Sequence, residues 1–197
     1  MNIEMIKKII LVILVLILGV GGFFWFKNRQ IKGSYKDYVV KEVGGRKVME
    51  NKKAGFSVSV PVGWEAKALN VEEGSMAFYY PGTEGEMRNG IISAPIKRGC
   101  VIETALLFKK MTFDEIKREL KLIHWGLGIK SEQVEEISIK GMPALKDSFD
   151  STALGSAIAV YILTEKVLYE FSFYPAPEDK LVCIQEFNKF LETISIK

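Results

Sequence analysis

The sequence contains little of the chemistry from which active sites are usually built. It has a single histidine, His124, and two cysteines, Cys100 and Cys183. One histidine cannot form a two-histidine metal site, and a nucleophile–histidine–acid triad would have to use this residue. His124 lies at the end of a predicted helix, where an imidazolium interacts favourably with the helix dipole, so a capping role is sufficient for it. We therefore predict no catalytic residue, no cofactor and no metal site, and a protein that is not an enzyme.

The sequence also lacks a dense acidic loop. Asp147 and Asp150 could meet a cation, and so could Glu84 and Glu86 in a Gly-rich loop. Hard cations such as calcium require about six or more oxygen ligands, which two carboxylates do not supply. We expect these four side chains to lie on the solvated surface.

Two cysteines provide neither a disulfide framework nor the ligand spacing of a metal site. Cys183 falls on the apolar face of the last predicted helix, together with Phe187 and Phe190. Because free cysteine is often a core residue, two buried thiols are favoured. One disulfide is the alternative if the domain is exported.

Net charge is nearly absent from most of the chain. The whole sequence has 27 Lys and Arg against 24 Asp and Glu, whereas residues 33–197 have 22 against 23. The positive excess therefore belongs to the first 32 residues. A protein that binds nucleic acid usually carries a basic excess on its folded domain, so a nucleic-acid partner is excluded.

What the sequence does contain is one long apolar run, which begins at Ile9 and ends at Phe26. As a helix, residues 9–26 would extend about 27 Å, close to the roughly 30 Å of hydrocarbon in a bilayer. Basic residues flank both ends, and the aromatic cluster at residues 23–26 suits the membrane interface. We predict a single transmembrane helix in contact with membrane lipid, preceded by a short tail at residues 1–8.

Two alternatives to an uncleaved anchor are less consistent with the sequence. A cleaved signal peptide would normally give way to a polar mature terminus, but here the apolar run continues through Phe26. A core helix is rarely apolar on every face. The flanking charges do not decide the orientation, because both flanks are basic.

The remainder of the chain divides into two parts. Residues 27–52 are rich in Lys, Gly and polar groups and show little periodicity, which predicts a juxtamembrane linker. Residues 53–197 have the length of one ordinary domain and can bury a core.

Within this domain, most segments have the composition or alternation of strands. The expected strands cover residues 56–60, 64–66, 76–80, 90–96, 134–140, 144–149, 157–163, 167–173 and 194–196. Thr112 and Glu115 form a capping box at the start of a helix that ends near Gly126. A second amphipathic helix covers residues 178–193 and is expected to face inward with Leu181, Ile184, Phe187 and Leu191. Residues 104–110 are expected to form an additional turn of helix. The predicted class is α+β, a mostly antiparallel β-sheet packed by two or three helices.

This pattern resembles the PsbP-like family of α/β sandwich domains. The resemblance is carried by residues 55–64, Gly-Phe-Ser-Val-Ser-Val-Pro-Val-Gly-Trp, which match an opening strand and a Pro-x-Gly-Trp turn. It continues in the closing hairpin at residues 169–173 and in the helix that follows. The resemblance implies an α/β/α sandwich in an exported, membrane-tethered protein, and it transfers no catalytic residue.

Two functions are consistent with these observations. The first is a non-enzymatic interaction or accessory domain, extracytoplasmic and single-pass at the cell membrane, with a protein partner. The second is a small-ligand binding or sensing domain, which predicts an apolar pocket near Trp64 or Tyr80. We expect Trp64, Tyr79 and Tyr80 to pack in the core, and the loop at residues 81–89 to be the first segment to consider for partner contact. An enzyme would need acid–base partners for His124.

Overall fold

A computed structural model describes residues 35–69, 75–88, 91–126, 128–129 and 131–197. The folded part is one compact unit, Lys32–Lys197. The predicted tail, the predicted membrane helix at residues 9–26 and the first part of the predicted linker lie outside the described residues. None of the helices that the structure describes is long and apolar enough to cross a bilayer.

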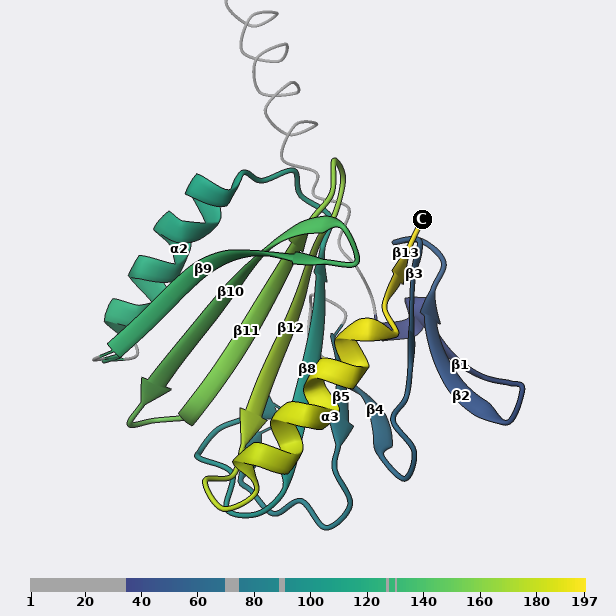
Figure 1. Cartoon of the computed structure of the whole chain (residues 1–197), viewed down its shortest axis with the longest axis horizontal. Coiled ribbons are helices and arrows are strands. Elements are labelled where there is room, and N and C mark those ends of the chain that lie inside the picture. Colours follow the sequence, from purple (N-terminus) through teal and green to yellow (C-terminus); the bar gives the residue numbers. More distant parts are fainter. Residues whose placement is uncertain (1–34, 70–74, 89–90, 127, 130) are drawn as a thin grey trace, which may run out of the picture. The chain divides into compact units, whose positions relative to one another are not determined.

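A seven-stranded sheet forms the centre of the fold (Figure 1), and each neighbouring pair in it is antiparallel. Its spatial order is β4-β5-β8-β12-β11-β10-β9. The strands are β4 (Glu65–Leu69), β5 (Ser75–Tyr79), β8 (Cys100–Leu107), β9 (Ser131–Ile139), β10 (Met142–Ser151), β11 (Gly155–Leu163) and β12 (Leu168–Pro175). The alternation of buried and half-exposed residues along β8 and β10 follows the period of two of a pleated strand.

A smaller, four-stranded sheet has the order β1-β2-β3-β13, and its pairs are also antiparallel. A 3-10 turn, η1 (Tyr35–Asp37), precedes it. Its strands are β1 (Tyr38–Val43), β2 (Arg46–Asn51), β3 (Phe56–Ser59) and β13 (Ser195–Ile196). A two-residue pair, β6 (Met87–Arg88) and β7 (Ile91–Ile92), lies in the segment between β5 and β8.

The two helices pack against opposite faces of the large sheet. Helix α2 (Phe113–Gly126) places Ile116 and Leu120 against Leu145 and Tyr161 of the sheet. Helix α3 (Lys180–Glu192) packs on the other face. Consecutive residues of a strand point to opposite faces, so Leu145 meets α2 whereas its neighbour Ala144 belongs to the core under α3.

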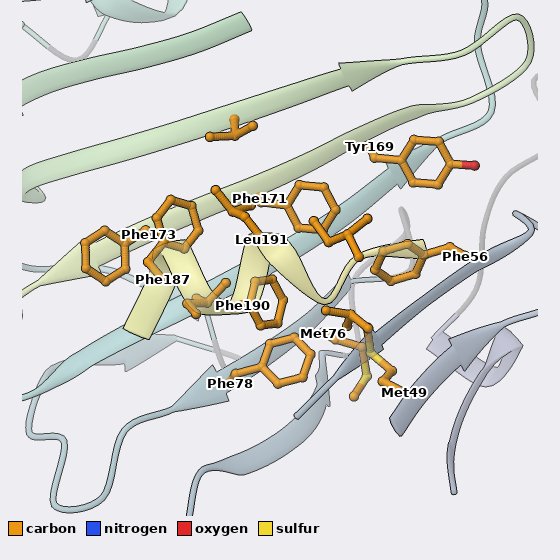
Figure 2. Packing of buried hydrophobic residues seen from close by; sticks show 14 of the residues in the cluster. Met49, Phe56, Met76, Phe78, Tyr169, Phe171, Phe173, Phe187, Phe190 and Leu191 are labelled. Atoms are coloured by element: carbon orange, nitrogen blue, oxygen red, sulfur yellow. The ribbon is translucent and has the colours of Figure 1, made fainter. Parts of the chain in front are cut away.

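The main core lies between α3, the small sheet and the large sheet. Figure 2 shows Phe187 and Phe190 of α3 beside Phe173, Phe171 and Phe78 of the large sheet. The rings of Phe173 and Phe187 are stacked with centroids 4.8 Å apart, and those of Phe78 and Phe190 meet edge to face at 5.1 Å. Both arrangements are favoured by aromatic quadrupoles.

The predicted α+β class with a mostly antiparallel sheet is confirmed, and two α-helices are present among the described residues. The capping box is also confirmed: the backbone N–H of Thr112 donates to the Glu115 carboxylate at 2.8 Å, and the N–H of Glu115 donates to Thr112 Oγ1 at 3.3 Å. The hairpin between β11 and β12 lies where the sequence predicted it.

The structure differs from the predicted linker over residues 27–52, because its second half forms the β1–β2 hairpin. Every residue of β1 after Tyr38 is exposed, and only Met49 and Asn51 are buried in β2. A hairpin with so few buried side chains shows almost no alternation of apolar and polar residues. Its sequence therefore resembled that of a linker.

Three further predictions were wrong. Residues 104–110 do not form a helical turn, since Thr104 lies in the central strand β8. That strand is covered on both faces and contains Ala and Leu, so its alternation is weak in the sequence. Of the described residues 91–96, Ile91–Ile92 alone form a strand, β7, instead of the longer extended segment that was expected. Leu181, expected to face inward from the last helix, is 79% exposed, whereas Cys183 takes the buried position.

The prediction of two buried thiols was also wrong. Cys100 and Cys183 are buried, as expected, but they are joined in a disulfide that links β8 to α3 across 83 residues of sequence. The spacing of two cysteines carries no information on whether a fold brings them together. The packing of α3 on β8 is what brings Cys100 and Cys183 together.

Candidate binding groove

An open groove of about 670 Å³ lies where three segments of the chain meet. The first is the turn between β1 and β2, the second is the turn between β3 and β4, and the third is the C-terminal half of α3. Its volume is within the range of about 300–1,000 Å³ that is usual for ligand sites. The residues that line it are Gly45, Arg46, Lys47, Ser59, Val60, Pro61, Val62, Gly63, Trp64, Glu186, Lys189, Phe190 and Thr193.

The floor of the groove is apolar and firmly packed. Val60, Trp64 and Phe190 are 6%, 5% and 1% exposed. The Trp64 indole is held edge to face against Tyr80 with ring centroids 5.5 Å apart. Because these side chains are fixed by the core behind them, the floor does not have to form when an apolar group binds.

The turn that places Trp64 is the Pro-x-Gly-Trp sequence noted above. The backbone N–H of Trp64 donates to the carbonyl of Pro61 at 3.1 Å, and Gly63 has a φ of +82°, which a residue with a side chain rarely adopts. Val62, between them, is 95% exposed at the rim of the groove. This backbone turn therefore directs Trp64 inward and leaves the apolar side chain of Val62 in solvent.

The rim carries most of the charge. Arg46 and Lys47 stand on the hairpin side, and Lys189 stands on the α3 side. Glu186 is the one carboxylate in the lining, and it pairs with Lys189 at 2.7 Å. Glu42 is directly across from Lys47 in the β1–β2 ladder. Even with both carboxylates counted, cations outnumber anions around the groove.

The groove lining has no assembled catalytic group. It contains the hydroxyls of Ser59 and Thr193, but neither histidine nor cysteine. The backbone N–H of Ser59 donates to Thr193 Oγ1 at 3.1 Å, and Thr193 Oγ1 donates to the carbonyl of Phe190 at 2.8 Å. The groove can therefore bind an apolar group and anions, but it lacks a nucleophile with an adjacent general base.

His124 is buried in a different part of the fold. Its Nε2 lies 2.8 Å from Oδ2 of Asp147, and the two residues are 4% and 0% exposed. The ring of Phe149 packs against the imidazole with centroids 5.3 Å apart. The expectation that Asp147 lies on the surface was wrong, whereas Asp150 is exposed and accepts a hydrogen bond from Ser156.

The same sheet face contains a second carboxylate, which is half-buried. Glu103 lies directly across from Ser172 in the ladder, and its Oε1 accepts the backbone N–H of Ile92 at 3.2 Å. Burial raises the pKa of Glu103 to about 7; the N–H of Ile92 acts in the opposite direction, and the charge of Glu170 raises it further. Burial likewise raises the pKa of Tyr161 and of Tyr174 on this face.

The structure also places the other residues that were singled out in the sequence. Glu84 and Glu86 are exposed, as expected, and Glu84 forms an isolated β-bridge with Arg98. Tyr79 is buried, and so is Trp64, which confirms their core packing. Trp64 nevertheless also borders the groove. Among the described residues, no three His, Cys, Asp or Glu side chains are arranged to hold a metal ion.

Sequence reasoning found Trp64 but missed the cations and the helix residues around it. Arg46 and Lys47 fell in the predicted linker, and Lys189 belonged to the polar face of an ordinary amphipathic helix. No local signal could have shown that these three residues share one groove with Trp64, since more than 120 residues separate Trp64 from Lys189 along the chain.

Similarity to known proteins is confined to solved structures. No protein-family model and no curated protein sequence matches the chain. Among solved structures, it is similar to a protein of unknown function from Pseudomonas aeruginosa, at 11% identity and a TM-score of 0.47, with 84% of this chain and 99% of that chain covered. It is also similar to cyanobacterial PsbP (CyanoP) from Synechocystis, at 9% identity and a TM-score of 0.48, with 79% and 94% covered. These likenesses transfer no site and no role.

Proposed function

We propose that this protein is a membrane-anchored, extracytoplasmic binding module of PsbP-like type, without enzymatic activity, whose groove beside Trp64 receives a segment of a protein partner. The observation that carries the proposal is the groove itself. A preformed apolar floor borders a charged rim and an exposed apolar side chain, Val62. Apolar anchors surrounded by polar rims are typical of protein interfaces.

The openness of the groove favours a chain segment as its occupant. Ligand pockets that bury most of a small molecule are deep, whereas this groove is bounded by two turns and one helix face and is open to solvent. A segment of polypeptide can enter such a groove and continue beyond both of its ends.

One feature supports the membrane anchor, and another supports a position outside the cytoplasm. The apolar run at residues 9–26 has the length of a membrane-spanning helix. The disulfide between Cys100 and Cys183 belongs to the folded unit, and disulfides form and persist mainly in oxidising compartments. With the anchor in the membrane, the domain would then face the oxidising side.

A role without catalysis is supported by the placement of the titratable groups. The groove has no histidine, and the one histidine is enclosed with Asp147 between α2 and the sheet. Asp147 is the kind of acidic partner that a catalytic histidine would need, but a substrate cannot reach this buried pair. Its geometry is that of a structural link.

A second candidate function, the binding of a small ligand, is favoured by the volume and the apolar floor of the same groove. An apolar pocket near Trp64 was the feature that this alternative predicted. The two functions differ in what occupies the groove, so one experiment can separate them.

That experiment is site-specific photo-crosslinking of the full chain in its native membrane. A photoreactive residue replaces Val62 at the groove, or Leu181 on α3 outside the groove lining, as a control of similar exposure. We expect a discrete protein adduct from position 62 and none from position 181. Adducts that contain only a small molecule would favour the second function, and equal labelling from both positions would contradict a role for the groove.

A further inference from the structure

We infer that the segment bound in the groove is acidic: an apolar or aromatic side chain contacts the floor of Val60, Trp64 and Phe190, and carboxylates beside it meet Arg46 on one wall and Lys189 on the other. This inference rests on the proposed function and specifies its partner by chemical class.

The charge of the rim is the first reason. Three cations line the groove against one carboxylate, although residues 33–197 as a whole carry slightly more Asp and Glu than Lys and Arg. Neither Arg46 nor Lys47 forms an ion pair within the part of the chain that the structure describes. A local excess of cations on a nearly neutral domain attracts anions and raises their association rate.

The placement of these cations is the second reason. Arg46 and Lys47 come from the hairpin of the small sheet, whereas Lys189 comes from α3. Positive charge therefore lies on two walls of a groove whose lining also includes the apolar floor. A single bound ion would need its cations converged on one point. Cations on separate walls suit a ligand in which anionic groups flank an apolar one.

The hydrogen bonding of the strand beside the groove is the third reason. The N–H of Ser59 is already bonded to Thr193 Oγ1, and the N–H of Val60 donates to the carbonyl of Lys47 at 2.8 Å. These donors are not available to pair with an added strand, as they would be in β-strand addition. Recognition must then depend on side chains, that is, on the apolar floor and the basic rim.

A displayed library of random heptapeptides, selected on the full chain in lipid nanodiscs, tests this inference. The first variant carries Arg46→Glu and Lys189→Glu, at two exposed positions of the rim. The matched control carries Lys110→Glu and Lys166→Glu, which changes the same net charge at exposed positions that do not line the groove. The unfolding midpoint of each variant verifies that the fold is retained.

We expect the enriched peptides to combine a large apolar residue with Asp or Glu on both sides. Their affinity should fall about tenfold or more in the first variant, stay unchanged in the control, and weaken as salt is added. Peptides that crosslink through position 62 but show no acidic bias would overturn this inference and leave the proposed function intact. If no selected peptide crosslinks at position 62, both are overturned.

Discussion

The imidazole of His124 and the carboxylate of Asp147 meet at 2.8 Å between α2 and β10, and both are withdrawn from solvent. The contact joins the last turn of α2 to the sheet at a point where the rest of the helix packs through aliphatic side chains such as Ile116 and Leu120. A buried ionisable group is tolerated only when another group compensates for its lost hydration. The two residues therefore depend on each other.

From this pair we predict that Asp147→Ala lowers the free energy of unfolding by about 3–5 kcal/mol, because it removes the carboxylate that contacts the buried imidazole of His124. Urea denaturation followed by circular dichroism measures the change. Asp150→Ala, three residues along the same strand but exposed, is the control and should change stability by less than about 0.5 kcal/mol. Similar losses in the two variants would show that the pair has no special role.

Stability should depend on pH through Glu103. Its pKa in the folded protein, about 7, is raised above the value of 4.5 for an exposed carboxyl. The folded state therefore binds a proton more tightly than the unfolded state, and this contribution to stability is fully present below pH 4.5. It is lost as the pH rises from 4.5 through 7, and amounts to roughly 3 kcal/mol at most.

Glu103→Gln tests that dependence, since glutamine resembles the protonated carboxyl and keeps an oxygen for the N–H of Ile92. We expect the midpoint of urea denaturation to fall less steeply between pH 4.5 and 7 in this variant than in the parent protein. Glu86→Gln, at an exposed position, should keep the parental slope. An unchanged slope in Glu103→Gln would assign the pH dependence to another group.

The disulfide should contribute a large part of the stability of the domain. Replacing Cys100 and Cys183 together by alanine opens a loop of 83 residues in the unfolded chain, and we expect the free energy of unfolding to fall by about 2–5 kcal/mol. A reductant should lower the melting temperature of the parent protein but not that of the double variant. A parent protein that melts at the same temperature with and without reductant would show that the bond is not formed in solution.

Alanine substitutions at two glycines with nearly equal φ values would separate the free-energy cost of a positive φ from the cost of a steric clash. Gly82 and Gly99 have φ values of +74° and +73°. A Cβ at position 82 would meet no atom within 4 Å, whereas one at position 99 would lie 2.6 Å from Thr83 Oγ1 and 3.1 Å from its Cα. We expect Gly82→Ala to cost about 1–2 kcal/mol of unfolding free energy.

Gly99→Ala should cost about 1–3 kcal/mol more than Gly82→Ala, because the added methyl also has to displace Thr83. The N–H of Gly99 donates to Asp179 Oδ2 at 2.7 Å, so a shift at this position would also disturb the contact with the start of α3. Equal costs at the two positions, measured by urea denaturation, would mean that the segment around Thr83 moves freely.

Local features of this protein were predictable because they depend on backbone geometry over a few residues. The capping box of Thr112 and Glu115 satisfies donors within one helical turn, and the alternation of Phe56, Val58 and their neighbours follows from the pleat of a single strand. The near-zero net charge of the domain follows from the residue counts alone. These observations were enough for the α+β class, whereas the absence of a nucleic-acid partner stays a prediction from the charge.

Tertiary structure alone decided which distant residues meet. The Cys100–Cys183 bond, the contact of His124 with Asp147 and the meeting of Arg46, Trp64 and Lys189 at one groove depend on strand order and on how α3 and the small sheet pack. Many arrangements of the same strands and helices would satisfy the same local patterns. They differ in the burial of side chains far apart in the sequence, and that free energy is determined only when the whole core is assembled.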